Sequence, residues 1–486
     1  MMKTSRKGRL LSLLLVIAML IIIPLNFTTY AAKRDRTAPT APANLQATSI
    51  TSTSVSLMWN KSTDNIGVTA YNIYRDSVYI GKIASCTYTA AGLSSSTSYK
   101  FLVKAVDGSG NISASSNIIT VTTLAATTTT PPPATTSAKK VVGYYAAWAA
   151  YSGFTPDRID CTKLTHINYS FANIGTDLKI ALGYPDIDPA NFTKLNALKQ
   201  INPNLKTLIS VGGWSWSGRF SDAALTDASR TAFADSCVDF IVNYGFDGID
   251  IDWEYPVAGG VSTNVRRPED KQNFTLLITK LRERLTARTS VTGKQYLLTI
   301  AGASGDWYIN NTELSLIHPY LDYANIMTYD IHGPWDPYTD FNAPLYNNTD
   351  TSPQDKWSVD ASVNAWLKTG IPADKLVVGV PFYGYKYTSV SNASNGLYQT
   401  YSGCSSIPYS AIASSYLNAG YVRYFHQQSM VPWLFNGSTF ISYDDEQSMG
   451  YKAQYIKSKA LGGAAIWELS QDPNKVLLGA LYNGLQ

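Results

Sequence analysis

The chain has 486 residues, a length that favours two or three compact domains. Charged residues make up only 15% of it and the formal net charge is +4, with no cluster of Lys and Arg beyond the extreme N-terminus. This balance argues against nucleic acid or another polyanion as a partner. Of the 11 Trp, all but Trp59 lie beyond residue 140, so we expect an amphipathic ligand to bind the C-terminal part of the chain.

Residues 1–32 have the layout of a secretory signal peptide. Four basic side chains lie among the first nine residues, an apolar run follows over residues 10–25, and the small residues Ala31 and Ala32 come next. The run is short for a membrane span. We expect cleavage, export, a secreted extracellular protein and no membrane contact afterwards. The alternative is an uncleaved anchor that holds the same domains outside the membrane.

Residues 38–124 are expected to form a small all-β sandwich. Short segments of alternating polarity are separated by turns rich in Gly, Asn, Asp and Ser, namely residues 54–59, 70–75 and 99–106. The opening PTAPANL, a single Trp59, and Leu93 followed by Tyr99 at the place of a tyrosine corner resemble a fibronectin type III domain. Because Trp59 is expected inside, we interpret this domain as a spacer, with carbohydrate binding as the alternative.

Residues 125–139 are expected to link this domain to the rest of the chain. They contain AATTTTPPPATTSA, a run of Thr, Ala and Pro without apolar periodicity. Such a composition is typical of a semi-extended linker.

Residues 140–486 are expected to fold as an α/β protein, a (β/α)8 barrel. Amphipathic stretches such as 227–245 and 270–285 alternate with eight β-rich apolar segments, and this alternation predicts a parallel barrel whose site lies where the strands end. The long interval of about 385–460 predicts a small α+β insertion between the seventh and eighth strands. The eight segments are residues 141–148, 165–172, 206–213, 245–254, 296–304, 323–330, 376–384 and 462–470.

The stretch DGIDIDWEYP, residues 247–256, overlaps the fourth of these segments and contains four carboxylates. Since side chains alternate along a strand, Asp250, Asp252 and Glu254 are expected on the barrel interior as a column that rises towards the mouth. Like charges so close cannot all ionise, so the column must share a proton, and the uppermost carboxyl is suited to general acid catalysis. Asp247 breaks the alternation and has no assigned position.

A buried ion pair or a metal cage is the structural alternative for this column. No Lys or Arg lies in the segment, and the four His are scattered along the chain, so neither a metal nor a cofactor is expected. The four Cys, at positions 86, 161, 237 and 404, also lack the spacing of metal ligands. They could form two disulfides in three connectivities, but free thiols are the preferred interpretation.

The segment DGIDIDWE matches the DxxDxDxE signature of glycoside hydrolase family 18, the chitinases. SVGG at 210–213 is similar to the third-strand motif of that family and MTYD at 327–330 to its sixth-strand motif, while Trp467 stands where the family has an eighth-strand Trp. The resemblance spans residues 140–486. It implies a hydrolase in which the substrate's own 2-acetamido group attacks the anomeric carbon.

The resemblance also implies a role for each matching residue. Glu254 would be the general acid and base, Asp252 would orient the acetamido group, and Asp250 would support Asp252 from below. The other matches are Tyr329, a donor to the acetamido carbonyl, Asp330, which would hold the distorted sugar, Trp467, the floor beneath that sugar, and Ser210, Gly212, Gly213 and Asp247, which belong to structural parts of the motifs.

Further aromatic residues at or just after strand ends are candidates for contacts with sugar rings. They are Tyr145, Trp148, Trp214, Trp216, Trp335 and Tyr383. Trp357 and Trp366, within helical stretches, are interpreted as packing residues. After GVPFYG many family members carry Arg, whereas this chain has Tyr385 and Lys386, which leaves the contacts on that side open.

The expected function is that of a secreted, monomeric, endo-acting chitinase that cleaves β-1,4 linkages between N-acetylglucosamine units with retention of configuration. An endo-β-N-acetylglucosaminidase acting on glycans or peptidoglycan would need the same acetamido chemistry and stays open. A chitin-binding lectin on an inactive scaffold is the alternative from another class; such proteins lack the acid, whereas Glu254 is present here.

Overall fold

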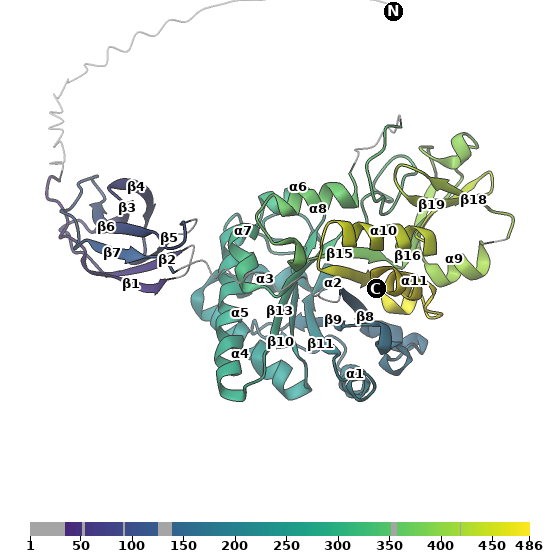
Figure 1. Cartoon of the computed structure of the whole chain (residues 1–486), viewed down its shortest axis with the longest axis horizontal. Coiled ribbons are helices and arrows are strands. Elements are labelled where there is room, and N and C mark those ends of the chain that lie inside the picture. Colours follow the sequence, from purple (N-terminus) through teal and green to yellow (C-terminus); the bar gives the residue numbers. More distant parts are fainter. Residues whose placement is uncertain (1–34, 51–53, 91–92, 125–138, 351–356, 418) are drawn as a thin grey trace, which may run out of the picture. The chain divides into compact units, whose positions relative to one another are not determined.

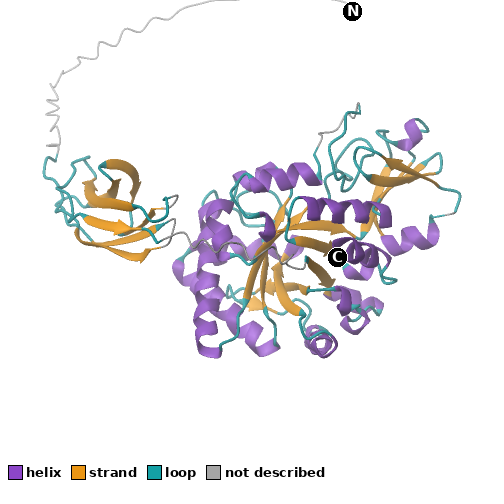
Figure 2. Cartoon of the chain, viewed as in Figure 1, coloured by secondary structure: helices purple, strands orange, loops and turns teal. Residues whose placement is uncertain are grey.

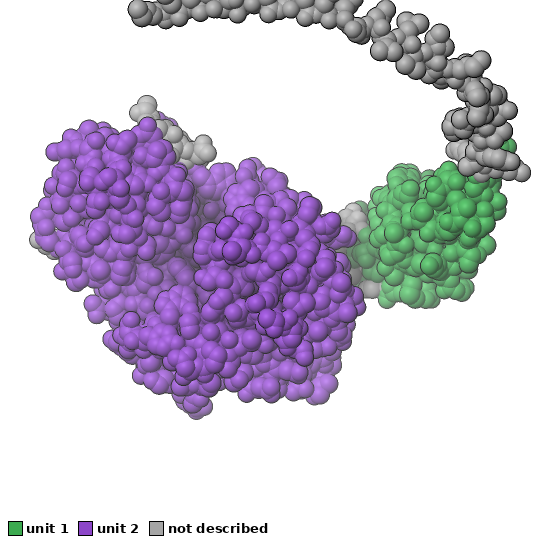
Figure 3. Space-filling model, turned by 180° about the vertical axis from the view of Figure 1, so that it is seen from behind, with its two compact units in different colours: residues 1–135 green, residues 136–486 purple. Residues whose placement is uncertain are grey.

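The computed structural model describes residues 35–50, 54–90, 93–124, 139–350, 357–417 and 419–486. The chain divides into two compact units, residues 1–135 and 136–486 (Figure 3). The expected signal peptide and residues 125–138 of the expected linker lie outside the described residues. Within the described parts of the chain, no helix is both long and apolar enough to cross a membrane.

The first unit is a β-sandwich, as the sequence predicts. One sheet has the strand order β1-β2-β5 and the other β4-β3-β6-β7, with antiparallel pairing throughout. Trp59 is 2% exposed in the core between them, and the Tyr99 hydroxyl accepts a hydrogen bond of 2.8 Å from the Ser94 amide, which confirms the tyrosine corner. The strands are β1 Ala43–Ile50, β2 Val55–Asn60, β3 Val68–Arg75, β4 Val78–Ile83, β5 Thr87–Ala90, β6 Ser98–Asp107 and β7 Ile119–Thr122.

The second unit contains the predicted parallel barrel (Figure 1). Each of its eight strands pairs in parallel with the next, and β21 pairs with β8, which closes the barrel. In sequence order the strands are β8 Lys140–Ala146, β9 His166–Ile174, β11 Lys206–Gly212, β12 Gly248–Asp252, β13 Leu297–Ala303, β14 Tyr323–Met327, β15 Leu376–Pro381 and β21 Gly463–Trp467, and a short β10 Ile180–Ala181 adds to β9.

Helices surround the barrel strands (Figure 2). The expected helix at 270–285 extends to Thr292 and ends at Gly293, whose φ is 72°. The residues of its last turns are mostly polar, so they show no apolar periodicity, but they are compatible with a helix. Between β8 and β9 short 3-10 turns replace an α-helix. The α-helices are α1 Asp188–Ile201, α2 Gly213–Trp216, α3 Phe220–Leu225, α4 Asp227–Tyr244, α5 Asp270–Thr292, α6 Asp306–Asn310, α7 Leu314–Ile317, α8 Val359–Leu367, α10 Glu446–Ser458 and α11 Val476–Leu485.

A second, five-stranded antiparallel sheet lies between the seventh and eighth barrel strands in sequence. Its order is β17-β16-β20-β19-β18, and aromatic side chains fill its core. Its strands span residues 383–442, whereas α10 belongs to the helices packed on the barrel and contacts α11. The elements of this inserted lobe are β16 Tyr383–Thr388, β17 Gly403–Pro408, α9 Tyr409–Ser415, β18 Val422–His426, β19 Val431–Phe435 and β20 Thr439–Ser442.

The fourth barrel strand places its two sets of side chains as alternation predicts. Ile249 and Ile251 are fully buried in the layer between strands and helices, and Trp253 joins them there at 1% exposed. The Trp253 ring stacks on Phe220 at 5.3 Å between ring centroids and meets Phe274 edge-on. This packing holds the strand end from outside and leaves the carboxylates to face inward.

Candidate active site

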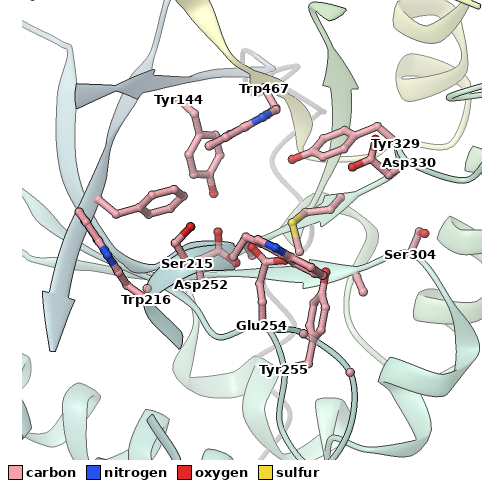
Figure 4. Close-up of a pocket in the computed structure, with 18 of the residues that line it drawn as sticks. Tyr144, Ser215, Trp216, Asp252, Glu254, Tyr255, Ser304, Tyr329, Asp330 and Trp467 are labelled. Atoms are coloured by element: carbon pink, nitrogen blue, oxygen red, sulfur yellow. The ribbon is translucent and has the colours of Figure 1, made fainter. Parts of the chain in front are cut away.

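A cavity of about 690 Å³ opens where the barrel strands end (Figure 4). Strands β8, β9, β11, β12, β13, β14 and β21 all contribute residues to it. Its lining combines two acidic groups of the fourth-strand segment with many aromatic rings: Tyr144, Trp148, Phe171, Tyr184, Gly212, Trp214, Ser215, Trp216, Asp252, Glu254, Tyr255, Gly259, Gly260, Ala301, Ala303, Ser304, Gly305, Trp307, Met327, Tyr329, Asp330, Trp335 and Trp467.

Asp250 lies beneath the cavity at the base of the carboxylate column. Its carboxylate accepts hydrogen bonds from the hydroxyls of Thr299 at 2.5 Å, Ser210 at 2.8 Å and Tyr144 at 2.9 Å. Full burial raises the pKa of Asp250, and these donors oppose that rise because they favour the ionised form. Asp250 is therefore a fixed group held by three hydroxyl donors.

Asp252 occupies the next position up the strand and lines the cavity. Burial raises the pKa of Asp252 well above its usual range, and the nearby charges of Glu254 and Asp250 raise it further. Among the described residues, no group donates a hydrogen bond to Asp252 Oδ1, although this oxygen is buried. An acceptor left without a donor in this place is suited to receive an N–H of a bound ligand.

Glu254 is 8% exposed and faces the cavity. Burial raises the pKa of Glu254 to about 7, with the charge of Asp330 adding to the rise and a hydrogen bond from the Tyr255 hydroxyl opposing it. Near neutral pH the side chain therefore carries a proton in a substantial fraction of molecules. A neutral carboxylic acid in a cavity can protonate the leaving oxygen of a bound substrate.

Tyr329 and Asp330 reach the cavity from the end of β14. Figure 4 shows the Tyr329 hydroxyl directed into the space above Asp252. Asp330 accepts hydrogen bonds from Tyr383 and, at 2.8 Å, from Tyr385. Solvent reaches Asp330 through the cavity, but the surrounding walls still desolvate its carboxylate and raise its pKa. The two tyrosines fix the direction of this carboxylate.

Five of the expected aromatic residues line the cavity: Trp148, Trp214, Trp216, Trp335 and Trp467. Trp467 packs against Tyr144 and Phe171, with 5.7 Å between ring centroids in each pair. Trp214 and Trp335 are more than half exposed, at 55% and 58%. Rings of this kind offer flat apolar faces to a ligand with flat apolar faces of its own.

The structure does not bring Tyr145 or Tyr383 to the cavity wall, which corrects the expectation for both. Tyr145 is fully buried on the outer side of β8, and its hydroxyl donates to the Phe154 carbonyl at 2.9 Å. Its neighbour Tyr144 lines the cavity instead, because adjacent residues of a strand face opposite sides. Tyr383 lies in the core of the inserted lobe and acts on the site through Asp330.

Asp247 is placed at the other end of β12, away from the cavity. Its carboxylate pairs with Lys199 at 2.6 Å and Lys294 at 2.8 Å and accepts a hydrogen bond of 2.9 Å from the Thr207 amide. Burial by itself raises the pKa of Asp247, but the two lysines outweigh that effect and lower it. A buried ion pair, the alternative considered for the carboxylate column, is thus found at Asp247, whose partners come from other segments. It is not found in the column itself.

The third-strand motif brings the backbone close to the column. Ser210 pairs with Asp250 in the ladder and also donates to its carboxylate. A Cβ on Gly212, at φ 102°, would lie 2.4 Å from the Asp252 carbonyl oxygen, and one on Gly213, at φ 70°, would lie 2.6 Å from the Phe171 ring. Both contacts are too short for any residue but glycine.

Among the unanticipated residues at the cavity, six have large side chains: Tyr144, Phe171, Tyr184, Tyr255, Trp307 and Met327. Tyr144 is the neighbour of the expected Tyr145, and alternation along β8 places the two on opposite faces. Tyr255 follows Glu254 directly and could have been found by its position. Phe171 and Met327 lie on strands β9 and β14, whereas Tyr184 lies in a loop and Trp307 in α6. The four Cys are free thiols; Cys161 and Cys237 are buried, as expected for most of them, and Cys86 and Cys404 are partly buried.

A closed parallel barrel whose strand ends carry a column of carboxyl groups and an aromatic cavity is the arrangement of a glycoside hydrolase. Residues 140–472 match the family described as Glycosyl hydrolases family 18, and residues 40–122 match the Fibronectin type III domain. The chain belongs to glycosyl hydrolases family 18 and carries a fibronectin type III domain before its barrel.

Known proteins similar to this chain include chitinases of several bacteria. Chitinase A1 of Niallia circulans is 45% identical over 405 residues, which cover 70% of this chain and 58% of that protein. Chitinase B of Serratia marcescens is 34% identical over 68% of this chain and 77% of that protein. Chitinase ChiA of Flavobacterium johnsoniae is 35% identical, but only 27% of its length is covered.

Solved structures are similar as well. A family 18 N-acetylglucosaminidase from Paenibacillus barengoltzii shares 39% identity and a TM-score of 0.66, over 71% of this chain and 99% of that one. Chitinase ChiA74 from Bacillus thuringiensis shares 37% identity and a TM-score of 0.68, over 72% of this chain and 70% of that one.

Proposed function

We propose that this protein is a secreted, monomeric chitinase that cleaves β-1,4 linkages between N-acetylglucosamine units inside the polymer. The observation that carries the proposal is the acid Glu254, with its raised pKa, at the top of a column of three buried carboxyl groups in an aromatic cavity. The chitinases among its relatives support the choice of substrate.

In the first step, Glu254 donates its proton to the glycosidic oxygen between two sugars. The 2-acetamido oxygen of the sugar on the non-reducing side attacks the anomeric carbon, the C–O bond to the leaving sugar breaks, and an oxazolinium ion forms. The ionised Glu254 then removes a proton from water, which opens that ion and regenerates the acid. Two displacements at one carbon retain its configuration.

Asp252 and Asp250 support this attack from the barrel side. Asp252 has an oxygen without a donor among the described groups, and it accepts the acetamido N–H. This contact turns the amide towards the anomeric carbon and stabilises the positive charge that develops on it. Asp250, held by three hydroxyls, supplies a fixed neighbouring group whose charge sustains the raised pKa of Asp252.

Tyr329, Asp330 and Trp467 hold the reacting sugar. The Tyr329 hydroxyl donates to the acetamido carbonyl, Asp330 accepts from a sugar hydroxyl, and the Trp467 ring lies beneath the sugar face. The hydroxyl direction of Tyr329 in Figure 4 and the two tyrosines that fix Asp330 support these roles. Trp148, Trp214, Trp216 and Trp335 extend the aromatic surface to neighbouring sugars.

Release of single N-acetylglucosamine units is the second candidate function, in place of cleavage inside the polymer. The N-acetylglucosaminidase that shares 39% identity over nearly its full length favours it. Product analysis on chitin oligomers of defined length separates the two, because internal cleavage yields dimers and trimers early, whereas terminal cleavage yields monomer. Peptidoglycan and N-linked glycans as additional substrates in the same assay test the action on other N-acetylglucosamine polymers.

Export is proposed from the N-terminal segment alone, with its basic start, apolar run and small residues. Expression in a secreting bacterial host should yield a protein in the medium whose first residue lies near residue 33. A protein that stays attached to cells at full length would identify an uncleaved anchor.

Replacement of Glu254 by Gln tests the catalytic assignment. The amide keeps the shape of the side chain but cannot donate the proton, so turnover of chitin oligomers should fall by about 10²-fold to 10⁴-fold. Oligomer binding, measured by calorimetry, should stay within a few fold of the unmodified protein. A variant that retains near-normal turnover would refute the assignment, and strong binding with no turnover in the unmodified protein would identify a lectin.

The nucleophile can be tested separately with a substrate that lacks the acetamido group. Chitosan oligomers carry a free 2-amino group, and their hydrolysis should be undetectable under conditions in which N-acetylated oligomers are cleaved. Equal rates on both substrates would make Asp252 the attacking group.

A further inference from the structure

The backbone of Glu254 lies beyond the barrel sheet. Strand β12 ends at Asp252, its last pair with β11 is Gly212 with Asp252, and its last pair with β13 is Ile251 with Ile300. The N–H and C=O of Glu254 therefore need partners other than the strand ladder, since buried backbone groups are rarely left unpaired.

Ser217 supplies one of these partners. Its hydroxyl oxygen accepts a hydrogen bond of 2.8 Å from the Glu254 amide. The same hydroxyl lies 2.8 Å from the Gly213 carbonyl and 3.1 Å from the Asp252 carbonyl, so it donates its one proton to these carbonyls. Ser217 is 1% exposed and follows α2 directly, which makes this contact a link between the third and fourth strand ends.

Asn264 supplies the other partner. Its Nδ2 donates a hydrogen bond of 2.9 Å to the Glu254 carbonyl. The loop that carries it folds tightly over this carbonyl, because a Cβ on Gly260, at φ 70°, would lie only 2.1 Å from the Glu254 oxygen. The Val265 amide donates to the Gly218 carbonyl at 3.3 Å, so this loop is joined to the Ser217 segment.

We propose that Ser217 and Asn264 are positioning residues that clamp the Glu254 peptide from both sides and aim its acid at the glycosidic oxygen. The proposal rests on the chitinase activity proposed above. A general acid must be held within about 0.5 Å of its productive place, and here no ladder bond does so. Without the Ser217 hydroxyl, the Glu254 amide loses its acceptor and the side chain can turn towards water.

Ser217→Ala and Asn264→Leu test the clamp. The Leu variant keeps about the size of the side chain and adds no charge, but it has no donor for the Glu254 carbonyl. Ser262→Ala, an exposed position in the same loop, is the matched control. In each clamp variant, kcat on chitin oligomers should fall about 10-fold to 100-fold, the loss expected from a small misplacement of a catalytic group, while KM changes less than about threefold because substrate contacts stay in place.

The pH profile is the readout that a purely structural effect would not move. Without the clamp, the Glu254 carboxyl group becomes more hydrated, and hydration lowers its pKa. The basic limb of the kcat/KM profile should therefore shift to lower pH in both variants, whereas Ser262→Ala should keep the profile of the unmodified protein. If Ser217→Ala does not fold, Asn264→Leu alone decides the matter, because residue 264 is only partly buried.

Two results would overturn the clamp. One is unchanged kcat in Asn264→Leu and Ser217→Ala. The other is a kcat that falls in proportion to the folded fraction of the variant while the pH profile stays that of the unmodified protein. Both are distinct from failure of the proposed function, in which the unmodified protein itself would not hydrolyse chitin oligomers or Glu254→Gln would remain active.

Discussion

Glu254 shows how its neighbours set the chemistry of a single carboxyl group. Burial raises its pKa to about 7, and the charge of Asp330 adds to the rise. Below about pH 7 the acid form that donates a proton prevails, and above it this form is lost. We therefore expect kcat/KM on chitin oligomers to fall as the pH rises through about 7.

Asp330→Asn provides a directed test of this pH dependence. The substitution removes a negative charge that raises the pKa of Glu254, so the basic limb of the kcat/KM profile should move to lower pH. Glu283→Gln removes an equal charge from the outside of α5 and serves as the control. A basic limb that stays in place in Asp330→Asn would mean that this charge does not act on the acid.

Gly212 connects the backbone of one strand to the catalytic column of the next. In Gly212→Ala the new Cβ would lie 2.4 Å from the Asp252 carbonyl, at a φ of 102° that alanine resists. We expect a loss of about 1–3 kcal/mol in the free energy of unfolding from backbone strain and a lower kcat, because Asp252 must move.

Gly479 in α11 is the matched control for this substitution. An added Cβ there meets no atom within 4 Å, and alanine favours a helix by about 0.5–1 kcal/mol over glycine. Gly479→Ala should therefore be equally or more stable and fully active. Equal destabilisation of both variants, measured by chemical denaturation, would contradict the explanation from close approach.

At the scale of elements, a buried ion pair joins helix α10 to the residue just before its N-terminal cap. Lys452 and Asp444 are 0% and 2% exposed, with 2.7 Å between Nζ and each carboxylate oxygen. Burial lowers the pKa of Lys452, and Asp444 opposes that change. Lys452→Met should cost about 3–5 kcal/mol, because it leaves a charge buried without its partner.

Lys457→Met, an exposed position on the same helix, should cost less than about 0.5 kcal/mol. Adding Asp444→Leu to Lys452→Met should recover most of the loss. Denaturant unfolding followed by Trp fluorescence reports on the barrel unit, since 10 of the 11 Trp follow residue 140. No difference between Lys452→Met and Lys457→Met would show that the pair does not stabilise α10.

Strand alternation explains the correct predictions at this scale and the misplacement of Tyr145. The eight expected strands and the inward face of β12 followed from apolar runs and period-two spacing, and the structure confirms them. Tyr144 and Tyr145 are adjacent, so the local pattern did not indicate which of them faces the barrel interior. The register of β8 against β9 and β21 decides that question, and register is a tertiary property.

At the scale of the whole molecule, the two units have separate hydrophobic cores, and every residue of the cavity comes from the second unit. A chain that begins at residue 136 should therefore hydrolyse soluble chitin oligomers with kcat and KM within about twofold of the full chain, as expected of independent domains. A tenfold loss would show that the first unit contributes to catalysis.

Binding of the same two proteins to insoluble chitin tests the role of the fibronectin type III domain. Trp59 is buried in its core and offers no ring to a sugar, so equal binding is expected for a spacer. Weaker binding of the shorter chain would identify a carbohydrate-binding surface on this domain.

The amino-acid sequence by itself determined the order of domains, the barrel and the identity of the carboxylate column, because these depend on periodicity, turn residues and residue spacing within short segments. Only the tertiary structure decided which residues complete the site. Ser217 and Asn264 reach Glu254 from segments 37 and 10 residues away, Asp247 finds its lysines on other elements, and Tyr144 replaces Tyr145 at the cavity. Contacts of this kind depend on strand register and loop conformation, which packing of the whole barrel sets and local sequence does not encode.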